Sequence, residues 1–408
     1  HTTVHLHNGD PDDPGYLTPT VLGPPQDTDD TKDAAITDIN GDGVPDVVIV
    51  NGPDQPSKLF IGDPNNPGNF EGREPRILEG TETDDTTSVA VGDLNNDGTP
   101  DIVFGNDGTP DKWAPMENTG LVDSSPSGGL KDLEDPSSTT TTDVAIADVD
   151  GDGNNDVVIV RKGDVDEIVL NPDPTGTGPG PLTKYVLEPT PGSPPTDSEG
   201  VKVVDLNNNP IDNVPEIIIA MANGDNVIYR RDTPGIPGNG LSLPSMTPQD
   251  LTHPSGVGGS TSVETVDVDE DGDLDVIFTN DDGTLTTWTN DGNAVLTGGD
   301  GSGTRKNTDS SGVMKVADFN GDDIPDVLSG TNIIFQPENT DPDKKGSGTG
   351  NFEDVEPNPY THGGVPTQGV VLDLDREDNM DIVAVVPDQP AVHCLLYTSD
   401  AADDVRGV

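Results

Sequence analysis

Carboxylate and amide side chains recur at a fixed spacing along this sequence. A copy that begins at Asp38 places oxygen-bearing side chains at its first, third, fifth and ninth positions, with a main-chain carbonyl available at the seventh. Oxygen ligands that converge in a tight loop suit Ca²⁺, which takes about six to eight of them at about 2.3–2.6 Å. Glycine at the sixth position permits the sharp turn that such a loop needs. We therefore interpret the motif as a calcium-binding loop.

Four copies of the motif are complete, and we assign calcium to them first. Their seventh residue contributes a main-chain carbonyl, and the ninth closes the site in place of a later ligand. The candidate ligands are Asp38, Asn40, Asp42, Val44 and Asp46; Asp93, Asn95, Asp97, Thr99 and Asp101; Asp148, Asp150, Asp152, Asn154 and Asp156; and Asp267, Asp269, Asp271, Asp273 and Asp275.

Three further copies depart from the pattern, so the sequence predicts up to seven sites and leaves the occupancy of these three open. One copy carries a short insertion, one has Asp323 at the glycine position, and one has Asp378 there. Their candidate ligands are Asp205, Asn207, Asp212 and Glu216; Asp318, Asn320, Asp322, Ile324 and Asp326; and Asp373, Asp375, Glu377 and Asp381.

Other interpretations of these loops are weaker. An EF-hand needs a bidentate glutamate at position twelve between two helices, but Ile49, Phe104 and Ile159 stand there. Transition metals prefer histidine or cysteine ligands, and neither lies near the loops. A single acidic segment could equally be a solvated turn. Seven copies in phase with strand-like segments disfavour that alternative.

The elements that must position these loops are short strands. The copies begin at residues 38, 93, 148, 205, 267, 318 and 373, a spacing of 51 to 62 residues that is close to one propeller blade. Apolar β-branched runs such as residues 47–50 and 157–160 follow each loop, and shorter apolar runs precede it, so each loop joins two strands. Weaker strands fit between copies. The sequence predicts an all-β chain, a seven-bladed β-propeller of four-stranded antiparallel blades.

The predicted blades divide one domain spanning residues 1–393. Small residues of the first strands, Ala34, Ala35, Ala90 and Ala145, suit a crowded axis. We expect thin core layers between blades, which would explain how a chain with 3% aromatic residues folds. The expected blades are residues 31–85, 86–140, 141–197, 198–258, 259–311, 312–365, and 366–393 completed by 1–30.

Composition excludes several classes of protein. The chain has 408 residues, with 77 acidic against 19 basic side chains and a formal net charge of −58. Nucleic-acid binding needs clustered basic residues, so we do not expect this chain to bind nucleic acid. No apolar run reaches the roughly 18 residues that span a bilayer, so membrane insertion is not expected. The single cysteine, Cys394, excludes a disulfide scaffold.

The repeated Asp-x-Asp/Asn-x-Asp-Gly-x-x-Asp loop resembles that of the FG-GAP/VCBS repeat family, whose members include the propeller of integrin α subunits. The resemblance extends over almost the whole chain. It implies a seven-bladed propeller with calcium in hairpin loops on one face, an extracellular setting, and a role in adhesion or interaction. The sequence departs from the integrin pattern because only Phe104-Gly105 matches, without regular FG or GAP flanks.

The two ends raise a question of strand order. Residues 3–7 and 16–22 would supply the third and fourth strands of the last blade, but residues 391–393 could begin a competing third strand. Either the C-terminal strand is excluded, or the N-terminal pair docks into a neighbouring molecule and builds a head-to-tail filament. Residues 394–408 break the repeat and resemble a translated adapter, so we expect a non-native tail.

The leading functional hypothesis is a secreted or cell-surface calcium-binding propeller that serves as an adhesion, interaction or structural module. Its partner would be a protein or glycan bound on the loops, or further copies of itself in a filament. O-linked glycans could decorate the loops rich in threonine, serine and proline at residues 121–142, 172–198 and 233–262. No catalytic constellation is visible. The alternative is a lectin or a polysaccharide-acting enzyme on the same fold.

Overall fold

The computed structural model describes a large part of the chain. None of the described residues lies in a helix, so none belongs to a helix that could cross a membrane. The described residues are 2–5, 20–22, 29–67, 70, 74–78, 81, 84–116, 130–133, 139–171, 183–187, 196–207, 214–231, 246–252, 257–269, 271–298, 305–306, 314–317, 324–329, 332–335, 354–356, 368–372, 381–385 and 393–396.

The strands follow one another in antiparallel sets of four, built from the β-branched runs around each acidic loop. Away from the chain ends the strands are β3 (Thr31–Thr37), β4 (Asp46–Asn51), β5 (Lys58–Phe60) and β6 (Arg76–Ile77); β7 (Asp85–Gly92), β8 (Asp101–Asp107), β9 (Lys112–Ala114) and β10 (Lys131–Asp132); β11 (Thr140–Ala147), β12 (Asp156–Asp164), β13 (Asp166–Leu170) and β14 (Thr183–Leu187); β15 (Thr196–Val204), β16 (Glu216–Met221), β17 (Asn226–Arg231) and β18 (Met246–Leu251); β19 (Ser260–Val266), β20 (Asp275–Asn280), β21 (Thr284–Asn290), β22 (Leu296–Gly298) and the extra β23 (Arg305–Lys306); and β24 (Met314–Ala317), β25 (Asp326–Ser329), β26 (Asn332–Phe335) and β27 (Asp354–Glu356).

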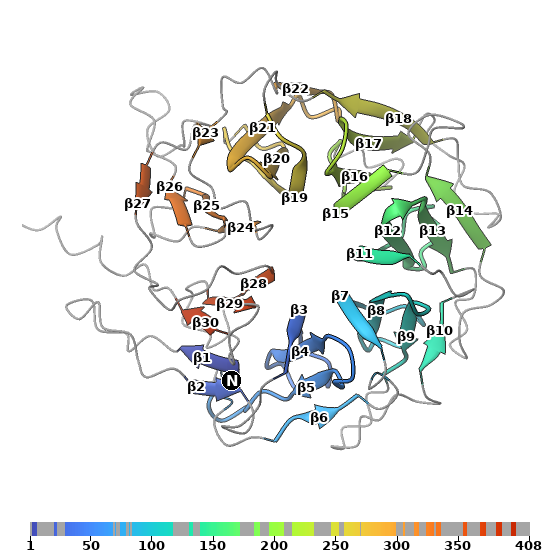
Figure 1. Cartoon of the computed structure of the whole chain (residues 1–408), viewed down its shortest axis with the longest axis vertical. Coiled ribbons are helices and arrows are strands. Elements are labelled where there is room, and N and C mark those ends of the chain that lie inside the picture. The colour runs from blue at the N-terminus through green and yellow to red at the C-terminus, as the bar shows by residue number, and fades with distance from the viewer. Residues whose placement is uncertain are drawn as a thin grey trace, which may run out of the picture.

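The sheets stand side by side around a common axis. Figure 1 shows the first strand of each set nearest the centre and the fourth strand at the rim. Short backbone bridges tie neighbouring sheets, for example between Thr140 of β11 and Asp107 of β8. This radial arrangement is the one expected for a β-propeller. It places the described loops at 93 and 148, each between a first and a second strand, next to one another.

The two ends of the chain meet in one sheet. Its order is β2 (Thr20–Leu22), β1 (Thr2–His5), β30 (His393–Leu396), β29 (Asp381–Val385) and β28 (Gln368–Leu372). The expected strand order is wrong, because β30 takes the place beside β29 and β1 pairs in parallel with β30 (Figure 1). Neither expected alternative holds within this structure: the C-terminal strand is included, and the N-terminal pair adds outside it in the same chain. A sheet can extend in this way wherever an edge offers unpaired backbone groups.

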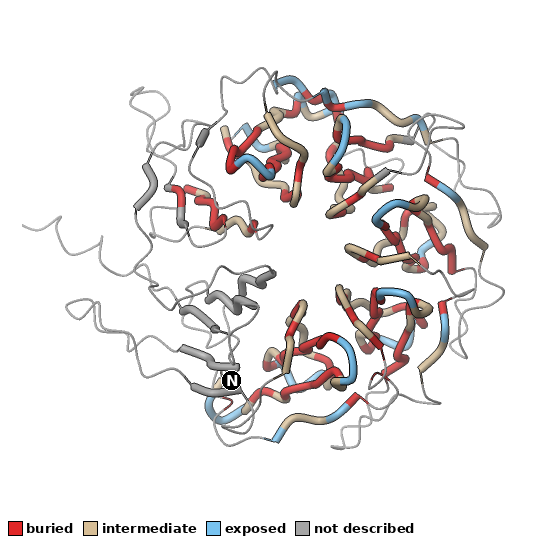
Figure 2. The backbone as a smooth tube through the Cα atoms, in the orientation of Figure 1, coloured by how far each residue is buried: buried red, intermediate tan, exposed pale blue. Residues whose placement is uncertain are grey.

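The hydrophobic core consists of layers between neighbouring sheets. Val48 of β4 shares one cluster with Phe104 of β8, and Trp113 of β9 shares another with Ile159 of β12. Figure 2 shows the buried residues concentrated in the middle strands of the sheets. The expectation of thin layers is met in the described part of the chain. Each sheet is therefore stable only with its neighbours in place.

A bulge recurs in the first strands and aims polar side chains at the axis. The register shifts between Thr31 and Asp33 in β3 and between Thr141 and Asp143 in β11, with similar shifts in β7, β15 and β19. A bulge bends its strand and redirects a side chain. Here it places Asp33 and Asp143 in the lining of a central cavity.

Candidate metal centres

The loop between β11 and β12 folds around the carboxylate of Asp148. Its Oδ1 atom accepts hydrogen bonds from the backbone N–H groups of Gly151 (2.7 Å) and Asp152 (3.1 Å), and Oδ2 accepts one from Gly153 (2.8 Å). Gly153 has a φ of +91°, a conformation in which a side chain is strained. The sixth-position glycine thus has the role expected from the sequence.

The other complete loops repeat this turn. The first-position carboxylate accepts from the amides of the fifth and sixth residues, and the fifth-position carboxylate accepts from the seventh. The contacts involve Asp38 with Asp42 and Gly43, and Asp42 with Val44; Asp93 with Asp97 and Gly98, and Asp97 with Thr99; and Asp267 with Asp271 and Gly272, and Asp271 with Asp273.

The ninth-position aspartate has a structural role that the sequence analysis missed. Asp156 is 1% exposed, and its two oxygens accept hydrogen bonds from the backbone N–H groups of Val149 (3.0 Å) and Asn171 (2.8 Å). It therefore ties the start of its loop to the end of the third strand. Asp46, Asp101 and Asp275 make the corresponding pairs of contacts.

The surroundings of these buried carboxylates disfavour their charged form. Burial raises the pKa of Asp156 to about 8; the Asn171 N–H opposes the shift, and the neighbouring Asp150 and Asp152 carboxylates increase it. Burial raises the pKa of Asp46, Asp101 and Asp275 to about 6. Removing carboxylates from water disfavours their charged form, and like charges nearby add to the effect. A cation among them would offset both costs.

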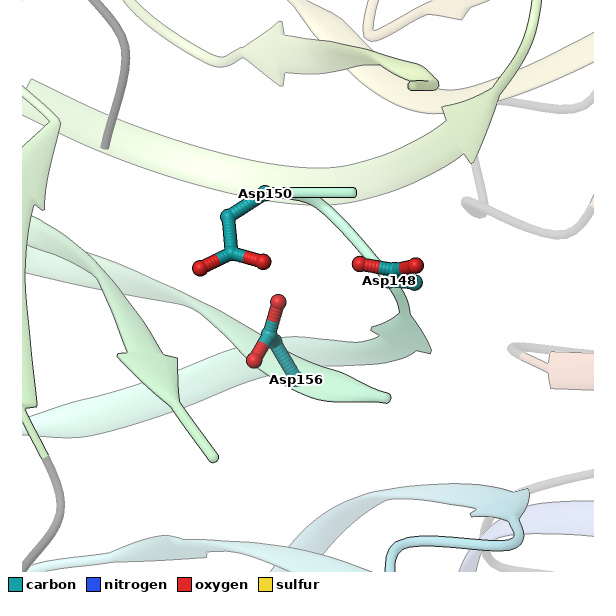
Figure 3. Close-up of side chains that lie close together, drawn as sticks. All are labelled: Asp148, Asp150 and Asp156. Carbon is teal, nitrogen blue, oxygen red and sulfur yellow. The ribbon is translucent and has the colours of Figure 1, made fainter. Parts of the chain in front are cut away.

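Two of the loops bring three carboxylates together. In each set, one oxygen from each of three side chains lies within 4.8 Å of the others: Asp148, Asp150 and Asp156 in one, and Asp267, Asp269 and Asp275 in the other. Figure 3 shows the first set around a common space. Two oxygens that share a calcium ion at about 2.3–2.6 Å can lie up to about 5 Å apart. The donor set and its spacing therefore fit Ca²⁺.

The loops at 38 and 93 have an amide at the third position, so they offer one carboxylate fewer. Asn40 Oδ1 accepts from the Asp42 N–H at 2.8 Å, and Asn95 Oδ1 accepts from the Asp97 N–H at 2.9 Å. Asp150 Oδ1 makes the same contact with the Asp152 N–H at 3.0 Å. All three loops therefore share one turn and differ mainly in charge.

The looser copies are described only in part. The Asn207 N–H donates to Asp205 Oδ1 at 3.1 Å. The buried Glu216 accepts from the Leu206 N–H (2.8 Å), as the ninth residue of a complete loop does, and its second donor is the side chain of Asn207 (Nδ2, 2.8 Å). Ile324 and Asp326 are buried, and Asp381 begins β29. Predicted ligands outside the described residues are Asp212, Asp318, Asn320, Asp322, Asp373, Asp375 and Glu377.

Two asparagines next to the loops also escaped the sequence analysis. Asn171 and Asn290 each stand 23 residues after the first aspartate of their own loop, and each reaches the loop of the preceding sheet. This shared offset was visible in the sequence. Its meaning was not, because the contact joins segments 77 and 84 residues apart.

A second group of charged side chains surrounds the axis. It lines a cavity of about 540 Å³ and includes Asp33, Asp143, Glu199, Lys202, Glu264 and Lys315. Glu264 lies between two lysines, with Lys202 Nζ at 2.5 Å and Lys315 Nζ at 2.7 Å from its oxygens. Asp33 and Asp143 accept from the Val89 and Val201 N–H groups of neighbouring sheets. These groups join first strands across the ring.

Comparisons with known proteins agree with this architecture. A family model described as an FG-GAP-like repeat matches residues 38–104 and 267–329. No curated protein sequence matched the chain. Crystals of BBS1N in complex with ARL6DN, one soaked with lead and one with mercury, are similar in structure: 12% identity, TM-score 0.53, and coverage of 98% of this chain and 99% of theirs. The WD40 β-propeller domain of Doa1 has 11% identity, a TM-score of 0.52 and coverage of 93% and 97%.

Proposed function

We propose that this chain, an FG-GAP-repeat β-propeller, is a calcium-binding module of seven blades that acts outside the cell in adhesion, interaction or structure. The observation that carries the proposal is the pair of three-carboxylate clusters at Asp148, Asp150 and Asp156 and at Asp267, Asp269 and Asp275. Buried acids with raised pKa values in the same loops support it, because a cation would relieve their repulsion.

Calcium would be held by the loop residues themselves. In the loops at 148 and 267, carboxylate oxygens of the first, third and ninth positions lie within 4.8 Å of one another, and the fifth-position side chain and seventh carbonyl would complete the shell. Bound Ca²⁺ supplies positive charge that stabilises the loops; its binding free energy adds to the stability of the fold. We place the protein outside the cell because extracellular calcium modules often bind at about 10⁻⁴–10⁻³ M, which cytosolic calcium does not reach.

The partner that we propose is a protein bound on exposed loops. The structurally similar BBS1N was crystallised with a protein partner, ARL6, which is an example of a propeller in that role. A glycan partner, or an enzyme acting on polysaccharides, is the alternative. Trp113 is only 2% exposed and is packed in the core, so its indole face is not offered for sugar stacking. Binding to a glycan array through an aromatic side chain that lies outside the core would favour the alternative.

Self-assembly is an extension of the proposal. The N-terminal strands join the final sheet through three residue pairs between β1 and β30. The same pairs could form between two molecules, which would build a head-to-tail filament. Light scattering in millimolar calcium distinguishes pairing within one chain from pairing between molecules. A mass near 42.5 kDa means closure within one chain, and large ordered particles mean a filament.

Isothermal titration with Ca²⁺ tests the metal sites. We expect several calcium ions per chain, with at least one fewer in Asp150→Asn/Asp152→Asn and in Asp269→Asn/Asp271→Asn. Asparagine keeps one side-chain oxygen acceptor at each position, so these variants change mainly charge. Asp250→Asn, at an exposed position of β18, is the control and should bind as the parent does. Identical stoichiometry in all variants would remove the basis for the proposal.

A further inference from the structure

We infer that Asn171 and Asn290 are positioning residues that couple calcium binding in one loop to the loop of the preceding sheet. The inference rests on the proposed calcium function and deepens it, because it states which sites act together. Each asparagine uses its backbone to hold the ninth-position aspartate of its own loop and uses its side chain to hold the neighbouring loop.

In the first pair, a chain of hydrogen bonds links the two ninth-position aspartates. The Asn171 N–H donates to Asp156 Oδ1 at 2.8 Å, and Asn171 Nδ2 donates to the carbonyl of Leu94. The N–H of the same Leu94 donates to Asp101 Oδ2 at 3.0 Å. A movement of Asp156 toward a cation therefore pulls on Asn171, on Leu94 and on Asp101.

The second pair repeats the arrangement in different sheets. The Asn290 N–H donates to Asp275 Oδ1 at 2.8 Å, and Asn290 Nδ2 donates to the Leu206 carbonyl at 2.7 Å. The Leu206 N–H donates to Glu216 Oε2 at 2.8 Å. The coupling thus extends to the loop that carries an insertion, and it gives that looser copy a link to a complete one.

Burial of the two asparagine side chains at these positions destabilises the fold. Each is 5% exposed, and each Oδ1 atom is buried without a hydrogen-bond partner in the described part of the chain. A buried acceptor without a partner loses the hydrogen bonds that it makes with water in the unfolded chain, which destabilises the fold. The equivalent residues are Gly62 and Met116, whose N–H groups hold Asp46 and Asp101 without a side-chain donor. The amide is therefore not needed to hold the ninth aspartate. Its Nδ2 atom donates both to the other loop and to the eighth residue of its own loop, Asn155 (3.2 Å) or Leu274 (3.0 Å), so it bridges the two loops.

The first pair has two more bridges. Asn96 Nδ2 donates to Asn154 Oδ1 at 2.6 Å, and Asn155 Nδ2 donates to the Asp93 carbonyl at 2.8 Å. These contacts join the turns themselves, in addition to the link through Asn171. Ordering one turn by a cation therefore lowers the entropic cost of ordering the other, which is positive coupling. Met116 provides no such link between the loops at 93 and 38.

Hydrogen exchange during a calcium titration measures this coupling at each loop. The amides of Asp97 and Gly98 report the loop at 93, and those of Asp42 and Gly43 report the loop at 38. Asp150→Asn/Asp152→Asn weakens the site at 148. We expect it to raise the calcium midpoint of the loop at 93 by about fivefold or more, as for a typical coupling free energy. In the Asn171→Met background the bridges from Asn96 and Asn155 remain, so the same change should raise that midpoint by a clearly smaller factor; an undiminished shift would exclude Asn171 as a coupling residue.

Controls separate coupling from simple damage. Asn171→Met copies the residue found at position 116, and circular dichroism of the cation-free variant checks its fold. If Asn171→Met does not fold, Asn290→Met tests the second pair, and the calcium midpoint is then measured at the loop that begins at Asp205. Asp93→Asn/Asp97→Asn should leave the midpoint of the loop at 38 unchanged. Calcium-dependent protection of both loops, with no effect of the 148 variant on the loop at 93, overturns the inference alone. Absence of any calcium-dependent protection overturns the proposed function and this inference with it.

Discussion

Lys315 Nζ of β24 lies 2.7 Å from Glu264 Oε1 of β19, on the wall of the central cavity. Burial would raise the pKa of Glu264, but the ammonium groups of Lys315 and Lys202 hold it below its usual value. Lys315 also interacts electrostatically with Asp33 and Asp143, which come from β3 and β11. One ammonium group therefore compensates acids from three other sheets.

Replacing Lys315 by methionine should destabilise the ring. The substitution removes one charged hydrogen bond of Glu264 and leaves Asp33 and Asp143 less compensated, so we expect a loss of about 2–3 kcal/mol in the free energy of unfolding. Urea denaturation measures it. Lys202→Met is the matched control, because Lys202 is more exposed and pairs with the same glutamate; its effect should be smaller. Equal effects of both variants would contradict this account.

Thr141 should be more important for stability than its neighbour Thr140. The Thr141 side chain is 1% exposed, and its hydroxyl donates to Asp111 of the preceding sheet, at 2.9 Å from Oδ1. Thr140 makes a similar contact with Asp107 at the surface. Thr141→Ala should cost about 1–2 kcal/mol because it removes one hydrogen bond of the buried Asp111 carboxylate, which keeps Asn106 and Arg161 as partners, and Thr140→Ala under about 1 kcal/mol. Thermal unfolding of both variants provides the comparison, and the reverse ranking would refute it.

Asp156 has a structural role as well as the proposed metal-binding role, and two substitutions separate them. Asp156→Asn removes the charge and keeps only one of the two oxygen acceptors, so one backbone N–H loses its acceptor at about 1–3 kcal/mol in the cation-free protein, and stabilisation by calcium falls as well. Asp156→Ala leaves the Val149 and Asn171 N–H groups without their acceptor, at about 1–3 kcal/mol each. Urea unfolding with and without Ca²⁺ measures both. Equal loss of cation-free stability in the two variants would show that charge, not hydrogen bonding, matters there.

Asp33 should make stability fall as the pH rises. Burial and the nearby Asp143 carboxylate raise the pKa of Asp33 to about 7, from 3.8. The folded protein therefore binds a proton that the unfolded chain has already lost, and this stabilisation disappears as the pH passes through the folded pKa. Between pH 5.5 and 8.5 the contribution is on the order of 2 kcal/mol. Unfolding of the parent and Asp33→Asn across this range isolates it; parallel pH profiles would count against the prediction.

The sequence was sufficient for the architecture because the relevant signals are local. Each acidic loop is followed by a β-branched run. In the four complete copies the second strand of the sheet begins at the ninth residue of the loop, at Asp46, Asp101, Asp156 and Asp275. The FG-GAP resemblance and the propeller class are confirmed by the family match and the structural neighbours. The sixth-position glycines have the positive φ that their turns require.

The strand order at the chain ends could not be read from the sequence. Residues 3–7 and 391–396 are both short apolar segments that can pair with the same edge, and local pattern does not rank them. The structure places β30 beside β29 and adds β1 outside it. This pairing joins the two ends of the chain, so a local sequence pattern contains no information on it.

The acidic loops and the strands that flank them could be predicted from the sequence, because both depend on residues close together in the chain. The folded structure alone shows which distant side chains meet. It placed Asn171 on the loop of the preceding sheet, Lys315 beside Glu264, and Asp33 near Asp143. These contacts span many tens of residues and arise from the order of sheets around the axis. A repeat predicts each sheet, but the polar contacts between sheets follow from residues that differ from copy to copy.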